Sequence, residues 1–442
     1  MIAPIEQLLS TLHSLGFPCE AGEVQEGPTV TLYEVRPKAG VRVEALARVG
    51  KSLAVALCAH SVRIIAPMTG RGTVGIEVAS NARKSVSLAS VMGAGGWDAM
   101  ALPLALGQSV SGGGVVCDLA EMPHLLVAGS TGSGKSVCLN SLILSLVSKH
   151  DAKGLRLLLI DPKQVELCAF AALPHLLCPI VTKADKAVAA LGWVTKEMQR
   201  RYSLFASLGV RSLAAHNKQS RAEDKLPRIV VVIDELADLM TAQKGEVEEL
   251  IARLSALARA AGIHLIICTQ RPSVGVVTGV IKANLPSRLA FRVASAVDSR
   301  VILDCKGAEA LVGKGDALLV MPGEMQPIRV QGCFVSDEEV ASLLETIVEG
   351  GAQSFVAGWE AAIAGDSSPN EAEGGSEPVL FSIDQACEVL RKDGYAQTAQ
   401  LQKALRWPKD VAQGCIDEME RRGIVGKGSP EAPRELLVSM SY

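Results

Sequence analysis

The segment from Gly129 to Ser136 reads G-S-T-G-S-G-K-S, which fits the phosphate-loop pattern G-x-x-x-x-G-K-[ST]. An apolar run at 124–128 precedes this segment, and leucine and isoleucine follow it at helical spacing through residue 148. Backbone N–H groups of such a glycine loop surround phosphate oxygens, and the N-terminus of the following helix adds its positive dipole end. The predicted phosphate-binding residues are Gly129, Ser130, Thr131, Gly132, Ser133, Gly134, Lys135 and Ser136.

Two carboxylates farther along the chain supply the hydrolytic part of the same chemistry. An apolar strand is predicted at 229–233, and Asp234 and Glu235 follow its last residue. Asp234 and the Ser136 hydroxyl are predicted Mg²⁺ ligands, while Lys135 reaches the β- and γ-phosphates. Glu235 is the predicted general base, which orients and deprotonates the attacking water. Together with the glycine loop, these residues indicate a nucleoside triphosphatase.

Gln270 and Arg259 are two further candidate catalytic residues. Gln270 follows a predicted strand at 264–269, and a polar side chain beside the strand that ends in Asp234 can sense the γ-phosphate. Arg259 lies near the end of a predicted helix at 247–261, where an arginine can stabilise the transition state in a neighbouring subunit of a ring. The alternatives are a capping role for Gln270 and a helix C-terminal cation for Arg259.

Composition excludes several classes of protein. The chain has 442 residues, a net charge of −3 and only 3% aromatic residues, so it is not globally basic and is not suited to stacking bases on aromatic platforms. A locally basic channel stays possible. No apolar run approaches the ~18 residues of a membrane-spanning helix, and the first residues lack the basic region of a signal peptide. Eleven cysteines without metal-binding spacing indicate reduced thiols and a cytoplasmic protein.

The segment 96–350 alternates strands and helices, which indicates an α/β fold. Its predicted strands are near-continuous apolar runs, as in a parallel sheet that helices cover on both faces. They lie at 124–128, 155–160, 229–233, 264–269, 289–293 and 317–320.

Smaller modules are predicted on either side of this core. Residues 1–95 are predicted to form an α+β domain with helices at 5–15 and 43–58 and strands at 29–35, 62–65 and 73–78. The segment 351–378 is predicted to be a flexible linker, because its part at 366–377 is polar, small and acidic. In 379–442, helices at 383–392, 398–405 and 409–422 followed by strand, turn and strand indicate a winged helix-turn-helix domain.

In combination, these motifs resemble the FtsK/SpoIIIE family of DNA translocases. The matching stretches are 124–136, 160–163, 174–179, 197–202, 229–238, 258–272, 279–284, 298–300, 313–316 and 327–330. The resemblance implies that 1–95 is the family's α domain, 96–350 its RecA-like P-loop NTPase core and 379–442 its γ winged-helix domain. It also implies a homo-hexameric ring that binds ATP and Mg²⁺ at subunit interfaces and double-stranded DNA in its centre.

The same resemblance suggests which cations contact DNA. Arg271, Lys282 and Arg300 lie in stretches that resemble the pore-facing loops, and Lys409 lies in the predicted recognition helix. Such side chains would bind phosphates without reading sequence; the alternative is that they form ion pairs at the surface or between subunits. The segment 379–442 departs from the family, because nine Lys/Arg and nine Asp/Glu leave it without net charge. It either reads another DNA sequence or binds a protein such as a recombinase.

The predicted function is ATP-driven translocation of double-stranded DNA, in chromosome segregation and cell division or in the transfer of plasmid or phage DNA. The alternatives are a protein-secretion ATPase of the same superfamily and a DNA-binding regulator that uses ATP only as a switch. A single phosphate loop and a helix-turn-helix tail argue against the secretion ATPase. Glu235 argues against the regulator, because a pure switch needs no catalytic base.

Overall fold

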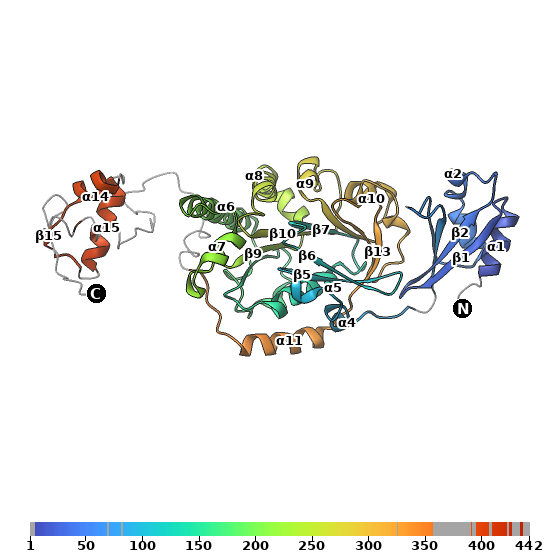
Figure 1. Cartoon of the computed structure of the whole chain (residues 1–442), viewed down its shortest axis with the longest axis horizontal. Coiled ribbons are helices and arrows are strands. Elements are labelled where there is room, and N and C mark those ends of the chain that lie inside the picture. The colour runs from blue at the N-terminus through green and yellow to red at the C-terminus, as the bar shows by residue number, and fades with distance from the viewer. Residues whose placement is uncertain are drawn as a thin grey trace. The chain divides into compact units, whose positions relative to one another are not determined.

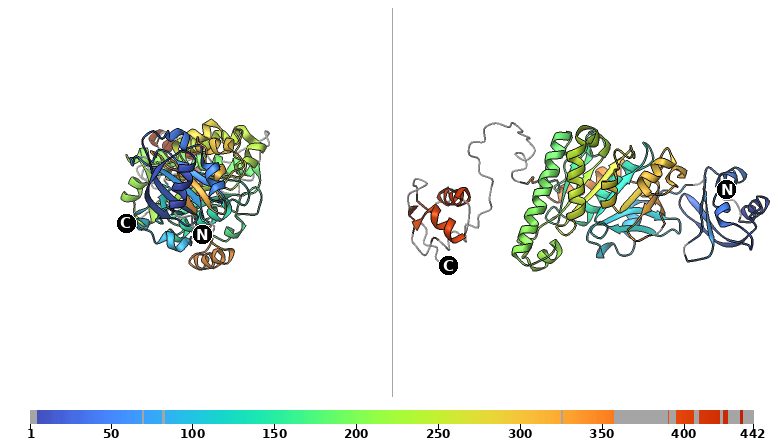
Figure 2. Two further views of the ribbon diagram at one scale, coloured as in Figure 1. Left: turned by 90° about the vertical axis from the view of Figure 1, so that its right-hand side faces the viewer. Right: turned by 90° about the horizontal axis from the view of Figure 1, so that it is seen from above.

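The computed structural model divides the chain into two compact units, Met1–Gly365 and Asp366–Tyr442. The residues it describes are 5–68, 70–80, 83–324, 326–356, 390, 395–405, 409–421, 424–426 and 434–435. The predicted linker beyond residue 356 and nearly all of the predicted helix at 383–392 lie outside these residues. Among the described helices, none combines the length and hydropathy that a membrane crossing needs. Figures 1 and 2 show the elements of each unit.

The first unit begins with a four-stranded antiparallel sheet that carries helices on one side of its core (Figure 1). The strand order is β1 (Cys19–Glu26), β2 (Val30–Pro37), β4 (Val74–Ala79), β3 (Val62–Ile65), and the helices are α1 (Ile5–Ser14), α2 (Val43–Leu46) and α3 (Gly50–Ala56). The predicted single helix at 43–58 is wrong, because turns at 47–49 divide it into α2 and α3. The sequence also missed β1, an edge strand whose mostly exposed residues lack an apolar pattern.

A nine-stranded sheet forms the rest of the first unit. Its order is β6 (Gly114–Asp118), β5 (Pro103–Ser109), β13 (Ile328–Gly332), β12 (Asp316–Val320), β11 (Ser287–Phe291), β7 (His124–Ala128), β10 (Ile263–Thr269), β9 (Arg228–Ile233), β8 (Leu155–Ile160). The five strands from β11 to β8 are parallel, which confirms the predicted parallel core. The sixth predicted strand, β12, instead pairs antiparallel with β11. An apolar run reports burial and not direction, so the sequence pattern could not reveal this reversal.

Both faces of the parallel strands are buried. In β7, Leu125 and Val127 pack in the core on the side of α5 (Lys135–Lys149), whereas Leu126 and Ala128 face the opposite core. The opposite core is covered by α6 (Ala184–Ser207) and α8 (Leu236–Leu257), which pack side by side (Figure 2). Successive side chains of a strand point to opposite faces, so two covered faces require apolar residues at every position.

The strand order brings the chemistry-bearing segments to one edge of the sheet. β10 lies between β7 and β9 and is parallel to both, so the carboxyl ends of the three strands are neighbours. Ligand sites of open parallel sheets form at this edge. The neighbouring positions of β10 and β9 confirm the arrangement expected for Gln270. The helix predicted at 247–261 corresponds to the second part of α8, which follows a kink at Gln243. Its predicted end is wrong, because α8 ends at Leu257, before Arg259.

The second unit contains a small apolar core under two helices, α14 (Thr398–Leu405) and α15 (Lys409–Arg421). These helices confirm the predictions at 398–405 and 409–422. A short strand before α14, β14 (Tyr395–Ala396), pairs antiparallel with β15 (Arg434–Glu435). The winged helix-turn-helix assignment of 379–442 stays a prediction.

Candidate functional site

The glycine loop connects β7 to α5, as its sequence pattern predicts. Gly134 is the N-cap of α5 and has a φ of +114°, a left-handed conformation that favours glycine. A Cβ atom at Gly134 would lie 2.5 Å from the backbone nitrogen of Gly315. Gly315 also donates its N–H to the carbonyl of Ser133 at 2.8 Å. A second segment, distant in sequence, therefore packs directly on the loop and requires glycine at this position.

The loop lines a cavity of about 400 Å³, within the range of small-molecule sites. Its walls are the loop itself, the start of α5, Glu166, Gln270, and two segments at 314–315 and 331–334. All of the predicted phosphate-binding residues except Gly129 and Ser133 line this cavity. Gly129 and Ser133 belong to the turn beneath it, where Gly129 donates its N–H to the Thr269 carbonyl and Ser133 to that of Ser130.

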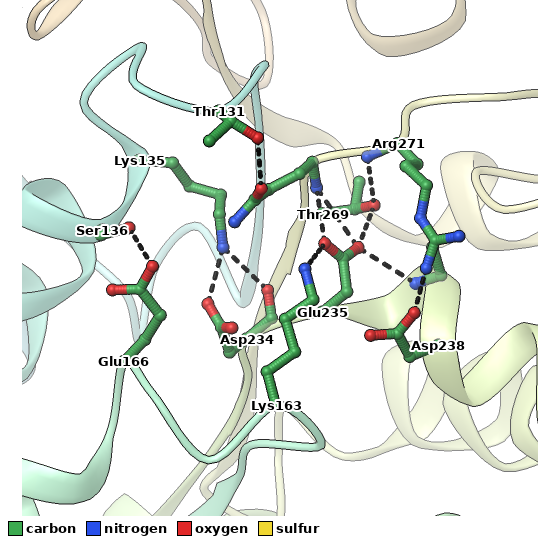
Figure 3. A network of polar contacts seen from close by, with 12 residues as sticks. Thr131, Lys135, Ser136, Lys163, Glu166, Asp234, Glu235, Asp238, Thr269 and Arg271 are labelled. Carbon is green, nitrogen blue, oxygen red and sulfur yellow. Dashed lines mark hydrogen bonds and ion pairs between the residues drawn. The ribbon is translucent and has the colours of Figure 1, made fainter.

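Lys135 and Asp234 form a buried ion pair at the floor of the site (Figure 3). The Lys135 Nζ lies 2.6 Å from Asp234 Oδ1 and 2.9 Å from the Asp234 carbonyl oxygen. The second carboxylate oxygen, Asp234 Oδ2, is buried and has no hydrogen-bond partner. A buried carboxylate oxygen without a partner is costly and fits a site that gains a cation together with its substrate.

Ser136, the other predicted Mg²⁺ ligand, donates its hydroxyl to Glu166 Oε1 at 2.6 Å. Hydroxyl and carboxylate oxygens are the ligands that Mg²⁺ prefers, so the donor set of Ser136, Asp234 and Glu166 suits this ion. In the part of the chain that the structure describes, no three His, Cys, Asp or Glu side chains form a metal cluster. Phosphate and water oxygens would therefore supply most of the coordination shell.

Glu235 is fully buried, and both of its carboxylate oxygens accept hydrogen bonds (Figure 3). Thr269 Oγ1 donates at 2.7 Å, the Gln270 N–H at 3.1 and 3.2 Å, and Lys163 Nζ at 3.1 Å. Burial alone would raise the pKa of Glu235, but the bonds from Thr269, Lys163 and Gln270 together lower it below its ordinary value. The side chain is thus an ionised carboxylate at neutral pH, the form that a general base requires.

Asp161 shapes the loop that carries Lys163 and Glu166. Its buried carboxylate accepts backbone N–H groups of four residues of this loop, Lys163, Gln164, Val165 and Leu167, at 2.9–3.1 Å. The sequence drew attention to the Asp161-Pro162-Lys163 stretch without giving it a role. It gave no signal for Glu166 or Thr269, whose importance depends on which strands become neighbours.

Gln270 bridges the strand ends and the glycine loop. Its side-chain oxygen accepts the Thr131 hydroxyl at 2.8 Å, while its N–H binds Glu235. One residue thus contacts the phosphate loop and the proposed base. Its role as a sensor of the γ-phosphate stays a prediction.

Arg259 lies away from these residues. It is an exposed residue in the turn between α8 and β10, on the side of the sheet where β10 begins. The glycine loop follows the opposite end of the parallel strands. Arg259 lines a separate cavity of about 520 Å³ with Arg228 and His264.

The predicted DNA contacts do not form one cluster. Arg271 pairs with Asp238 at the carboxyl edge of the sheet (Figure 3). Lys282 was expected in a loop but lies in a short helix, α9 (Gly279–Asn284), and its Nζ is 2.6 Å from Asp304 Oδ1. Asp304 also binds Arg288, next to the start of β11.

The other two predicted DNA contacts lie on helices. Arg300 is an exposed residue in the last turn of α10 (Ala296–Leu303). Lys409 is the first residue of α15, and its side chain lies outside the described part of the structure.

Comparison with known proteins places these features in a family context. A model of the FtsK alpha domain matches residues 3–80, and a model of the FtsK/SpoIIIE family matches residues 92–274; together they cover more than half of the chain. The chain is 44% identical to the DNA translocase FtsK of Clostridium tetani over 98% of its own length. It spans 58% of the length of that relative.

Solved structures with a similar fold are also known. The pCW3 conjugation coupling protein TcpA, solved with ATPγS, superimposes with a TM-score of 0.56 and 24% identity, over 77% of this chain and 98% of that chain. The type VII secretion ATPase EccC of Thermomonospora curvata gives a TM-score of 0.51 and 29% identity, over 58% of this chain and 31% of that chain.

The contact between Lys163 and Glu235 gives a testable pH dependence. Lys163→Ala removes an ammonium group that lowers the pKa of Glu235, so this pKa rises. A base with a higher pKa is protonated to a larger extent at a given acidic pH, so the acidic limb of the pH profile for nucleotide hydrolysis moves to higher pH. The measurement is kcat/KM across acidic and neutral pH, with Lys186→Ala, an exposed lysine of α6, as the control. Superimposable profiles for the two variants would contradict the assignment.

Proposed function

The chain belongs to the FtsK/SpoIIIE family, and from this premise we propose that it is an ATP-driven translocase of double-stranded DNA. The observation that carries the proposal is the meeting of Lys135, Asp234, Glu235 and Gln270 at one edge of a RecA-like parallel sheet. The similarity to a DNA translocase extends over nearly the whole chain. Lys135 would bind phosphate, Asp234 the metal ion, and Glu235 would act as the base. Gln270 connects Glu235 to the glycine loop.

Hydrolysis would proceed through the side chains of this edge. Lys135 leaves Asp234 for the β- and γ-phosphates, which frees a carboxylate for the metal. Mg²⁺, when bound by Ser136 and Asp234, supplies positive charge to the phosphate oxygens. Glu235 orients the attacking water and takes its proton, and for this one of its oxygens must be released by Lys163 or Gln270. Gln270 then transmits the change at the base to Thr131 of the glycine loop.

A homo-hexameric ring would explain the position of Arg259. The residue is exposed and lies at the end of the parallel sheet opposite its own glycine loop, so it is suited to act on the site of a neighbouring subunit. An arginine supplied in this way stabilises the charge of the phosphoryl-transfer transition state.

DNA would contact the cations Arg271, Lys282 and Arg300 in the centre of the ring; Arg271 and Arg300 are exposed, and Lys282 is half-buried. In the described chain Arg271 and Lys282 are held by Asp238 and Asp304. Exposed ion pairs of this kind stabilise a protein by only about 0–1 kcal/mol, so DNA phosphates can replace the carboxylates at small cost.

The second unit would act on loading or direction, through DNA at Lys409 or through a recombinase. Its predicted segment, 379–442, carries no net charge, which favours a role other than holding the duplex during movement. A location in the cytoplasm would suit the free thiols of the first unit, such as the buried Cys138 and Cys268.

The alternative of a protein-secretion ATPase has weaker support. The similarity to EccC covers 58% of this chain, whereas the similarity to the DNA translocase covers 98% at a higher identity.

Two variants separate nucleotide binding from hydrolysis. Lys135→Ala is expected to abolish ATP binding, because the loop loses its phosphate cation. Glu235→Gln keeps the shape of the side chain but removes the base, so it is expected to bind ATP and to lose at least about 10²-fold in kcat. Equilibrium binding of a fluorescent ATP analogue and steady-state phosphate release measure the two effects. Wild-type turnover by Glu235→Gln would refute its role as the base.

The trans role of Arg259 predicts complementation between subunits. Arg259→Ala alone is expected to bind ATP but to lose about 10³-fold or more in turnover. In mixed rings with Lys135→Ala, some interfaces pair an intact loop with an intact arginine, and these interfaces should hydrolyse ATP. ATPase activity across a series of mixing ratios measures this rescue. Intact rings without rescue at any ratio would mean that Arg259 acts in its own subunit or not at all.

The DNA contacts predict a loss that is independent of sequence. Lys282→Ala with Arg271→Ala is expected to lower DNA-stimulated ATPase and translocation on any duplex, and to reduce the salt slope of DNA binding by about two for two lost phosphate contacts. Triplex displacement on linear DNA measures translocation. Arg200→Ala is the matched control, because Arg200 is similarly exposed and paired with Glu197.

Deletion of residues 379–442 tests, in the same assay, whether the second unit is needed for movement. It should leave translocation on random duplex nearly intact and alter only loading or direction. If the deletion stopped translocation while the double variant moved normally, the roles of the two parts would have to be exchanged.

A further inference from the structure

A buried arginine joins the two sheets of the first unit. Arg329 of β13 binds Asp316 through two hydrogen bonds, at 2.9 and 2.6 Å, and Glu77 at 2.8 Å. Asp316 lies on β12 of the nine-stranded sheet, whereas Glu77 lies on β4 of the N-terminal sheet, where it also pairs with Arg63. Burial alone would lower the pKa of Arg329, but the two carboxylates raise it above its ordinary value, so the group stays charged.

Asp316 in turn closes the segment 312–316, which we call the clasp loop. Its Oδ2 accepts the N–H of Val312 at 2.7 Å. Gly315, at the centre of the clasp loop, donates to Ser133 of the glycine loop at 2.8 Å and accepts from Gly332 of β13 at 2.7 Å. The clasp loop is therefore held between β13 and the glycine loop, and the two glycines Gly134 and Gly315 leave no space between them.

Gln331 makes a second connection along the same path. Its side-chain oxygen accepts the hydroxyl of Thr29, the residue before β2 of the N-terminal sheet, and its side-chain nitrogen donates to the Lys314 carbonyl at 3.0 Å. Gln331 also lines the nucleotide cavity, together with Lys314 and Gly315. Two side chains of one strand thus contact the N-terminal sheet on one side and the clasp loop on the other.

We propose that Arg329 and Gln331 are positioning residues that couple the N-terminal sheet to nucleotide binding. Glu77 fixes the side chain of Arg329, and Thr29 fixes that of Gln331. Arg329 and Gln331 in turn hold the clasp loop in place. The clasp loop then keeps Ser133 and Gly134 in the backbone conformation that binds phosphate. The inference rests on the proposed function only in that nucleotide binds at the glycine loop. Gln331 lines the cavity, whereas Arg329, Glu77 and Thr29 do not. These three residues act through the clasp loop, so we expect their effect on affinity rather than on the chemical step.

Coupling of this kind is reciprocal. If the N-terminal sheet strengthens nucleotide binding, bound nucleotide must stabilise the contacts of the N-terminal sheet by the same factor. Amide hydrogen exchange in β4 should therefore slow when nucleotide is added, and this slowing should depend on Glu77.

Glu77→Gln tests the connection while leaving Arg329 paired with Asp316. The probe is a fluorescent ATP analogue with Mg²⁺, and we expect about tenfold weaker binding with a smaller change in kcat. Glu77→Asp, which keeps the charge, should recover part of the affinity. The matched control is Glu34→Gln on β2, since Glu34 is a carboxylate of the same sheet whose described partners, Thr73 and Arg71, are both in the N-terminal part.

Thr29→Val provides an independent variant that preserves side-chain shape and removes only the bond to Gln331. It should weaken nucleotide binding in the same direction even if Glu77→Gln folds poorly. Equal affinity in the wild type, Glu77→Gln and Thr29→Val would overturn the coupling, and so would an equal loss in Glu34→Gln. A wild-type chain that binds no nucleotide at all would instead overturn the proposed function, and this inference with it.

Discussion

The neighbouring carboxyl ends of β7, β10 and β9 are the constraint on which the site depends. The glycine loop follows β7, Gln270 follows β10, and Asp234 and Glu235 follow β9. Because β10 is parallel to both neighbours and pairs with each over most of its length, a change in its register would move Gln270 away from both the loop and the base. The packing of the side chains of these strands fixes this register, because a shift of one residue would place every side chain against the wrong one of the two helical layers. The geometry of the catalytic groups is therefore a consequence of how the core packs.

Burial of charge sets how costly it is for each ion pair of the molecule to lose a partner. Lys135, Asp234, Glu235 and Arg329 are almost completely buried, and each has an opposite charge within hydrogen-bond distance. Removal of one partner of a buried pair costs about 3–5 kcal/mol, because the other charge is left without compensation. Exposed pairs contribute about 0–1 kcal/mol, so Arg271 and Lys282 can change partners readily. Lys135 and Asp234 can therefore separate only when phosphate and a cation replace the lost partners, whereas the pairs of Arg271 and Lys282 can open without such a replacement.

The sequence predicted those features that depend on local pattern. The glycine loop, the strand before it, the acids after β9 and the helices α14 and α15 each have a signature within one element. Features that depend on distant segments were missed. Glu166 gained importance only because Asp161 folds its loop toward Ser136, and Lys163 only because that loop reaches Glu235. Lys282 was predicted to bind DNA, with an ion pair as the alternative, but the sequence did not indicate that its partner is Asp304, the C-cap of α10.

The antiparallel half of the large sheet shows why such contacts escape a local pattern. The strands β5, β6 and β13 include glycine or polar residues, so they lack the continuous apolar runs of the parallel core. Their polar residues are nevertheless the ones that carry long-range bonds: Arg329 and Gln331 of β13 reach both the N-terminal sheet and the clasp loop. A buried arginine needs partners that cancel its charge, and here those partners come from two different sheets. The residues that make β13 hard to recognise as a strand are therefore the ones that connect the N-terminal sheet to the wall of the nucleotide cavity.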